Sequence, residues 1–134
     1  MDIAIVGATG NVGRKILEVL EKKELSFDNL HLVASSKSVG KKIIFKEKEH
    51  EVSNLESFDF SKVKIAFFSA GGKISEKFAE KAAKSCLVID NSSYFRMDPD
   101  VPLIVPQVNP EALKNIKKNI ISNPNCSTAQ LVIA

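Results

Sequence analysis

The chain opens with a short apolar run that passes directly into a glycine-rich turn. Residues 3–6 are long enough for a buried strand, and residues 7–13 read Gly-Ala-Thr-Gly-Asn-Val-Gly. The apolar residues that follow recur at helical spacing, at Val12, Ile16, Leu17 and Leu20. Such a turn lets backbone N–H groups at a helix start face a phosphate without intervening side chains. A turn that serves only packing would share the glycines, but its place between strand and helix favours nucleotide binding.

Strand-length apolar runs and helical patterns then alternate along the chain. Further strands are predicted over residues 30–34, 65–68, 87–90 and 120–122, and further helices over residues 74–83 and from residue 127 onward. Residues 42–45 and the region of Val52 predict a short hairpin outside the main sheet. The alternation predicts an α/β fold of the Rossmann type, a doubly wound and mostly parallel sheet with helices on both faces.

Prolines shape the segment before the last strand. Residues 101–108 contain Pro102 and Pro106, so this segment is expected to be extended without forming a central strand. Asn109 and Pro110 then predict a helix start, with asparagine as N-cap and proline at the first helical position. The final predicted helix has no stop signal. We therefore expect residues 1–134 to be one nucleotide-binding domain of a longer protein, whose C-terminal domain lies outside this sequence.

Composition excludes several classes of protein. The 134 residues are 44% hydrophobic and 26% charged, with a formal net charge of +3, as in ordinary globular domains. The lysines are interleaved with acids, which argues against a nucleic-acid binder, and no apolar run approaches the ~20 residues of a membrane span. Two cysteines without an export signal point to the cytoplasm, and no Cys/His cluster has the spacing of metal ligands.

The loop after the second predicted strand bears on the choice of nucleotide. An NAD site usually has an acidic residue there to bind the ribose hydroxyls. This chain instead has Ser35, Ser36 and Lys37, which suit a 2′-phosphate, although a solvated loop would read similarly. Small and hydroxyl residues also follow two later strands, at residues 69–72 and 91–93, where ligands of open α/β sheets bind. We therefore expect NADP as the cofactor.

The sequence Asn-Pro-Asn-Cys-Ser-Thr at residues 123–128 is the part of the chain best suited to chemistry. Cys126 lies where a strand gives way to a helix, and unpaired N–H groups at a helix start favour the thiolate that attacks a carbonyl. Asn125 and nearby amides are candidate donors to an oxyanion. Cys86, between a helix and an apolar strand, is interpreted as structural, and neither His31 nor His50 is expected near Cys126.

Four motifs together resemble bacterial aspartate-semialdehyde dehydrogenase over nearly the whole chain. They are the glycine turn at residues 7–13, Asp-Asn-Ser-Ser-Tyr-Phe-Arg at 90–96, Val-Pro-Gln-Val-Asn at 105–109 and Asn-Pro-Asn-Cys-Ser-Thr at 123–128. The resemblance implies that NADP(H) binds at Thr9, Gly10, Asn11, Val12, Ser35, Ser36, Ser69, Ala70 and Gly71. It also implies that Cys126 is the nucleophile, that Asn125 assists it, and that Arg96 binds phosphate. Many relatives have arginine where Ala34 precedes the serines, and Lys37 is the nearest replacement.

The reaction implied by the resemblance is the reductive dephosphorylation of L-aspartyl 4-phosphate to L-aspartate 4-semialdehyde. Cys126 would displace phosphate to form a thioester, which hydride from NADPH would reduce, in lysine, methionine and threonine synthesis. The family is homodimeric, and its acid–base histidine and remaining substrate residues lie in the second domain. We therefore expect this chain to bind nucleotide with little or no turnover.

Three other functions share features with this sequence. N-acetyl-γ-glutamyl-phosphate reductase shares the glycine turn and the thioester route, but its cysteine usually follows Asn-Pro-Gly, where this chain has Asn125. Short-chain dehydrogenases use a Tyr-x-x-x-Lys pair, whereas Asp98 stands four residues after Tyr94, the sole tyrosine. A non-catalytic nucleotide-sensing domain with an inert Cys126 stays open, and thiol reactivity is the property that distinguishes it.

Overall fold

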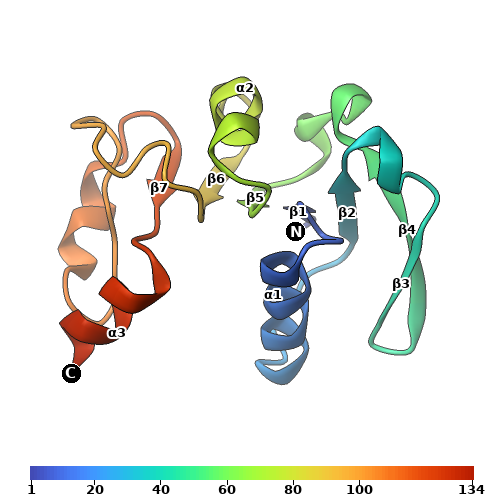
Figure 1. Ribbon diagram of the computed structural model, residues 1–134, viewed down its shortest axis with the longest axis horizontal. Coiled ribbons are helices and arrows are strands. Elements are labelled where there is room, and N and C mark those ends of the chain that lie inside the picture. Colours follow the sequence, from blue (N-terminus) through green and yellow to red (C-terminus); the bar gives the residue numbers. More distant parts are fainter.

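The computed structural model describes residues 1–134 as one sheet with helices packed on its faces (Figure 1). Its strands are β1 (Ile3–Val6), β2 (Leu30–Ala34), β3 (Lys42–Phe45), β4 (Lys48–Asn54), β5 (Ile65–Phe68), β6 (Leu87–Asp90) and β7 (Ile120–Ser122). Its α-helices are α1 (Asn11–Lys22), α2 (Gly72–Ala83) and α3 (Cys126–Ile133). The five strands predicted for the main sheet and the three helices predicted after residues 10, 73 and 126 are therefore confirmed.

The sheet is doubly wound around its central strand. Its order is β3-β4-β2-β1-β5-β6-β7, and only the β3–β4 pair is antiparallel. The chain moves outward from β1 to β2 on one side and crosses back to β5 on the other, so the winding direction changes between β1 and β5. Ligands of open α/β sheets bind at the carboxyl ends of the strands beside such a change.

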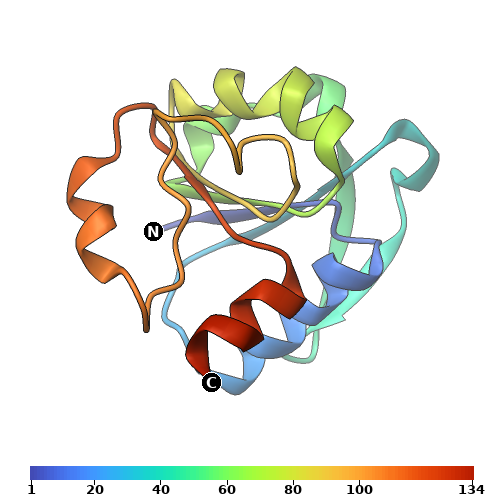
Figure 2. The same cartoon turned by 60° about the vertical axis from the view of Figure 1, so that its left-hand side comes forward.

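Alternating side chains of β1 build a core on each face of the sheet. Ile3 and Ile5 pack with Leu17 and Leu20 of α1, whereas the other face packs against α2. That second core includes Ala4, Val6, Phe68, Phe78 and Val88. Helix α2 therefore lies on one side of the sheet, and α1 and α3 lie on the other (Figures 1 and 2). This confirms the predicted helices on both faces.

The structure differs from the sequence predictions in three local features. The hairpin β3–β4 joins the main sheet, because β4 pairs in parallel with β2 through Val52. The segment after Asn109 is a 3₁₀-helix over Pro110–Asn115, and the Asn109 side chain does not cap it. Val12 lies in the predicted apolar stripe of α1 but is 44% exposed. Residues 101–108 form no central strand, as expected, and contribute one bridge between Leu103 and Ser122.

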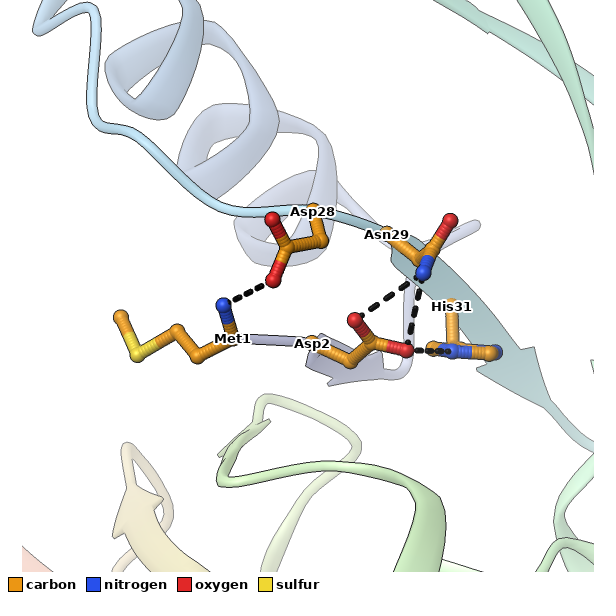
Figure 3. A network of polar contacts seen from close by, with 5 residues as sticks. All are labelled: Met1, Asp2, Asp28, Asn29 and His31. Carbon is orange, nitrogen blue, oxygen red and sulfur yellow. Dashed lines mark hydrogen bonds and ion pairs between the residues drawn. The ribbon is translucent and has the colours of Figure 1, made fainter.

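A polar network ties the start of β1 to the segment leading into β2 (Figure 3). The N-terminal amine pairs with Asp28, and the Asn29 Nδ2 donates to both Asp2 carboxylate oxygens at 3.0 and 3.1 Å. His31 Nε2 lies 3.4 Å from Asp2 Oδ2. These contacts lower the pKa of Asp2. The hydrogen bonds from Asn29 have the largest effect, and the hydrogen bond and charge of His31 add to it.

None of the α-helices combines the length and the apolar character that crossing a membrane requires. The side of the sheet shared by α1 and α3 has an apolar hollow of about 350 Å³, lined by Val12, Ile16, Val19, Phe67 and Ile89 among others.

Candidate functional site

All site residues predicted from the sequence lie beyond the carboxyl ends of the parallel strands. Residues 7–12 follow β1, Ser35 and Ser36 follow β2, and residues 69–71 follow β5. Arg96 lies in the turn after β6, and Asn125 and Cys126 follow β7. Parallel pairing of β2, β1, β5, β6 and β7 thus brings five separate chain segments to one edge of the sheet.

Two glycines of the turn are required by the fold itself. Gly7 has φ +86°, and a Cβ there would lie 2.9 Å from the backbone of Ser69 and Ala70. A Cβ on Gly13 would lie 2.2 Å from the Gly7 carbonyl oxygen. Ser69 Oγ in turn donates to the Val6 carbonyl at 2.8 Å. The glycine turn and the turn after β5 are therefore packed backbone against backbone.

Gly10 is different, because the protein leaves room for a side chain there. It has φ −80° and ψ 168°, open to any residue, and an added Cβ would lie 3.4 Å from its nearest neighbour. Gly10 is the N-cap of α1 but supplies no side-chain cap, and the first amides of that helix, at Asn11, Val12 and Gly13, donate to no protein acceptor. A pyrophosphate fits this helix start, because its oxygens can accept hydrogen bonds from the unbonded amides.

The loop after β2 adjoins the glycine turn. Thr9 Oγ1 lies 3.4 Å from Ser38 Oγ, at the end of the 3₁₀ turn Ser36–Ser38. Ser35 and Ser36 are exposed, so their hydroxyls are accessible to a ligand. These hydroxyls and Lys37 form the end of the site that could hold a 2′-phosphate.

A cavity of about 460 Å³ lies beside Cys126 and reaches Val12 at the start of α1. It is lined by Val12, Asn91, Arg96, Asn125 and Cys126, together with residues 104–107 and 123–124 and two further residues of α3. Of the nine predicted nucleotide-binding residues only Val12 lines this cavity. The predicted residues therefore divide into a nucleotide end at the turn and the loop after β2, and a reactive end at Cys126.

Cys126 is the first residue of α3, and it is exposed. Asn125 is the N-cap, and its Oδ1 accepts from the Thr128 amide at 2.8 Å. That bond leaves the Asn125 Nδ2 hydrogens free to donate. The amides of Cys126 and Ser127 are also free to donate. The thiol therefore has several N–H donors close by that could stabilise a negative oxygen on a bound acyl group.

Arg96 is held at the cavity by backbone carbonyls and by no carboxylate. Its Nε donates to the Asn123 carbonyl at 2.9 Å, and one terminal nitrogen donates to the Asn91 carbonyl at 3.3 Å. Arg96 takes part in none of the ion pairs of this structure. A fixed guanidinium with uncompensated charge is suited to bind a phosphate or carboxylate.

Cys86 has the structural role expected from its sequence context. It is buried, and its Sγ donates to the Ala82 carbonyl at 3.3 Å. Burial raises the pKa of this thiol to about 11, so it is protonated at neutral pH. His31 and His50 line a different hollow, near the amino-terminal ends of the strands, and do not line the cavity of Cys126.

Sequence reasoning gave no role to several residues of the cavity. Gln107 and its neighbours lie on the loop of residues 103–109, which the Asn109 side chain closes: its Oδ1 accepts from the Val105 amide and its Nδ2 donates to the Leu103 carbonyl, both at 2.9 Å. The Val-Pro-Gln-Val-Asn motif was the available signal, because prolines on both sides of an extended segment and a following asparagine mark a fixed loop.

Comparison with known proteins shows the family to which this chain is similar. Residues 2–116 match the model of the semialdehyde dehydrogenase NAD-binding domain. The chain is 56% identical to an aspartate-semialdehyde dehydrogenase of Aquifex aeolicus, over 98% of the chain and 40% of that protein. The chain thus spans about two fifths of the length of the relatives it matches.

Solved structures agree in fold. The crystal structure of aspartate semialdehyde dehydrogenase II from Vibrio cholerae, complexed with ASA, matches with a TM-score of 0.96 and 52% identity, over 98% of this chain and 44% of that one. The enzyme of Candida albicans, solved with NADP, matches with a TM-score of 0.77 and 30% identity, over the same shares of the two chains.

Proposed function

The chain belongs to the semialdehyde dehydrogenase family through its NAD-binding domain, and from this premise we propose that it is the nucleotide-binding part of an NADP-dependent aspartate-semialdehyde dehydrogenase. The whole protein would convert L-aspartyl 4-phosphate to L-aspartate 4-semialdehyde with release of phosphate. The observation that carries the proposal is the shared cavity, which places Cys126, Arg96 and Asn125 beside Val12 of the glycine turn.

Cys126 is proposed as the nucleophile. Its thiolate attacks the acyl carbon of the substrate, an S–C bond forms, the C–O bond to phosphate breaks, and a thioester and free phosphate result. Arg96 holds the phosphate group, because its guanidinium is fixed by the Asn91 and Asn123 carbonyls and has no competing carboxylate. Asn125 Nδ2 and the first amides of α3 stabilise the oxygen that becomes negative during the attack.

The cofactor proposed is NADP. The pyrophosphate would be held by the bare amides of Asn11, Val12 and Gly13, at the place where Gly10 leaves space. The 2′-phosphate would be held by Ser35 and Ser36, with Lys37 adding charge. When bound, NADPH supplies the hydride for reduction to the aldehyde. The NADP in the Candida albicans relative and the ASA in the Vibrio cholerae relative support this choice of ligands.

For the 134 residues by themselves the proposal is narrower. They bind the nucleotide and present a reactive thiol, with little or no turnover, because the chain spans 40% of its relatives and contains no histidine near Cys126. For the whole protein we propose a cytoplasmic homodimer in the synthesis of lysine, methionine and threonine.

The first test is the rate of Cys126 alkylation by iodoacetamide as a function of pH, with and without NADP, in a Cys86→Ser background. We expect Cys126 to react faster than free cysteine, because unbonded amides surround it at the start of α3. We expect NADP to change that rate, because Val12 lines the same cavity as the thiol.

Two results would contradict the proposal in different ways. A thiol as slow as free cysteine, in a chain that still binds NADP, would favour a nucleotide-sensing domain with an inert Cys126. If NADP neither changes the alkylation rate nor binds to the chain, the proposed nucleotide site is wrong.

A further inference from the structure

Asp90 is a buried carboxylate without a cation. It ends β6, is 0% exposed, and forms none of the ion pairs in the structure. Its partners are neutral: Ser75 Oγ donates at 2.7 Å, Ser92 Oγ at 2.7 Å and the Ser92 amide at 3.1 Å. Burying an unpaired charge is costly and is tolerated only where donors surround it. A carboxyl group buried on three donors from two chain segments is a fixed point of this part of the fold.

The bonds of Asp90 lead to the turn that presents Arg96. Ser92, held twice by the carboxylate, accepts from the Tyr94 amide at 3.2 Å, and the Arg96 amide donates to the Ser93 carbonyl at 3.4 Å. Phe95, only 1% exposed, fixes the same turn to the core. The path from the buried carboxylate to the guanidinium therefore contains no exposed, freely rotating side chain.

Both carbonyls that hold the guanidinium are also fixed next to Asp90. The Asn91 carbonyl belongs to the residue that follows Asp90, and the Asn123 amide donates to the Asp90 carbonyl at 2.8 Å. Arg96 Nε donates to the carbonyl of that same Asn123. Asp90 is thus the junction of the segment containing Arg96 and the segment leading to Cys126.

We propose that Asp90 is a positioning residue for Arg96: its buried carboxylate, acting through Ser92, sets the turn that aims the guanidinium at the phosphate-binding part of the cavity. This inference rests on the proposed function of Arg96 and adds a residue to it. Ser75 donates to the same carboxylate from α2 and forms no hydrogen bond with residues 92–96, so its hydroxyl is expected to contribute to stability without setting the turn.

The two serines provide a matched pair of variants. Ser75→Ala and Ser92→Ala each remove one buried hydroxyl that donates to Asp90 at 2.7 Å. Both are therefore expected to lower the melting temperature. Only Ser92→Ala also frees the Tyr94 amide and loosens the turn of Arg96.

The experiment measures how strongly inorganic phosphate protects Cys126 of the full chain from iodoacetamide, in the Cys86→Ser background. Ser92→Ala is expected to weaken protection by at least roughly tenfold, because displacing a binding group by about 1 Å can cost up to about a hundredfold. Ser75→Ala is expected to leave protection unchanged. Asp90→Asn, which keeps an acceptor for the Ser92 amide, is expected to fall between Ser92→Ala and the parent.

Each contrary outcome has a distinct meaning. If phosphate protects the parent and the two alanine variants equally, Asp90 does not position Arg96, although the proposed role of Arg96 stands. If both variants lose protection in proportion to their loss of stability, the network is structural and the inference is wrong. If phosphate does not protect the parent, the phosphate role of Arg96 fails together with this inference, and NADP binding tests the rest of the proposed function separately.

Discussion

At position 10 an alanine Cβ would lie 3.4 Å from the Gly7 carbonyl oxygen, and at position 13 it would lie 2.2 Å from the same atom. We therefore expect Gly10→Ala to lower the melting temperature only slightly, since alanine is a poorer N-cap than glycine. We expect it to weaken NADP binding, because the methyl group would occupy the approach to the first amides of α1. Gly13→Ala should instead destabilise the fold by several kcal/mol, since helix and turn must move apart. Thermal melts and NADP titration by calorimetry measure both effects.

The two variants act as controls for each other. Loss of NADP affinity in a stable Gly10→Ala chain would support a ligand at the bare helix start. Unchanged affinity in that variant would show that the pyrophosphate does not approach Gly10, whatever Gly13→Ala does to stability.

The two cysteines show how much chemistry the sequence predicts at the scale of single residues. Polar neighbours around Cys126 and apolar ones around Cys86 predicted a functional and a structural thiol, and in the structure Cys126 is exposed and Cys86 is buried. The setting of Arg96 was not predictable in this way, because it depends on carbonyls of Asn91 and Asn123 that meet only through the pairing of β6 with β7.

At the scale of the element, Asn125 has two functions that a substitution can separate. Its Oδ1 caps α3, and its Nδ2 is proposed to stabilise an oxyanion. Asn125→Ser should keep the cap, because serine is an equally good N-cap, and should lose the amide donor. We expect acylation of Cys126 by p-nitrophenyl acetate to slow by at least about tenfold, as when one oxyanion donor is removed elsewhere.

Alkylation by iodoacetamide is the control for this prediction, because that reaction develops no oxyanion. Its rate should stay near that of the parent in Asn125→Ser. An equal loss in both reactions would mean that Asn125 acts on the thiol itself. Unchanged acylation would assign the oxyanion to the backbone amides of Cys126 and Ser127 alone.

Helices and strands were predictable from the sequence where the local pattern of apolar residues determines them. They were not predictable where a side chain has alternative hydrogen-bond partners. The spacing of apolar residues was sufficient for α1 and for the parallel strands. Asn109 was expected to cap a helix, yet its side chain bonds back to Leu103 and Val105, because asparagine can satisfy a loop as readily as a helix start. Val12 fits the apolar stripe of α1 but lines the cavity of Cys126 instead.

At the scale of the whole molecule, one topological rule accounts for the composition of the site. Parallel strands all end at the same edge of the sheet. Predicting a parallel α/β sheet from the sequence therefore already brings residues from five distant segments together at that edge. The pairing of β4 with β2 was not predictable, since the hairpin has no pattern that distinguishes a free excursion from an edge extension. The strand order and the depth of the cavity likewise required the structure.

The pKa shifts of the molecule predict the pH range in which it is most stable. Hydrogen bonds and charges of lysines lower the pKa of Glu18 to about 2, and polar partners lower those of Asp2, Asp59 and Asp98. A carboxyl whose pKa is lowered by folding stabilises the native state above its unfolded pKa. That stability is lost as pH falls, here from about 4.5 towards 2. The acid limb should be shallow, because these groups are near the surface and screened by solvent.

The alkaline limb is expected to depend on Cys86. Burial raises its pKa from 9.0 to about 11, so its contribution is complete below pH 9.0 and is lost as pH rises towards about 11. Urea unfolding of the parent and of Cys86→Ser over this range isolates the effect, since serine can donate to the same Ala82 carbonyl without ionising. The unfolding free energy of the parent should decline more steeply than that of the variant. Parallel curves would show that the Cys86 thiolate is tolerated in the folded state, and that the alkaline limit is set by other groups.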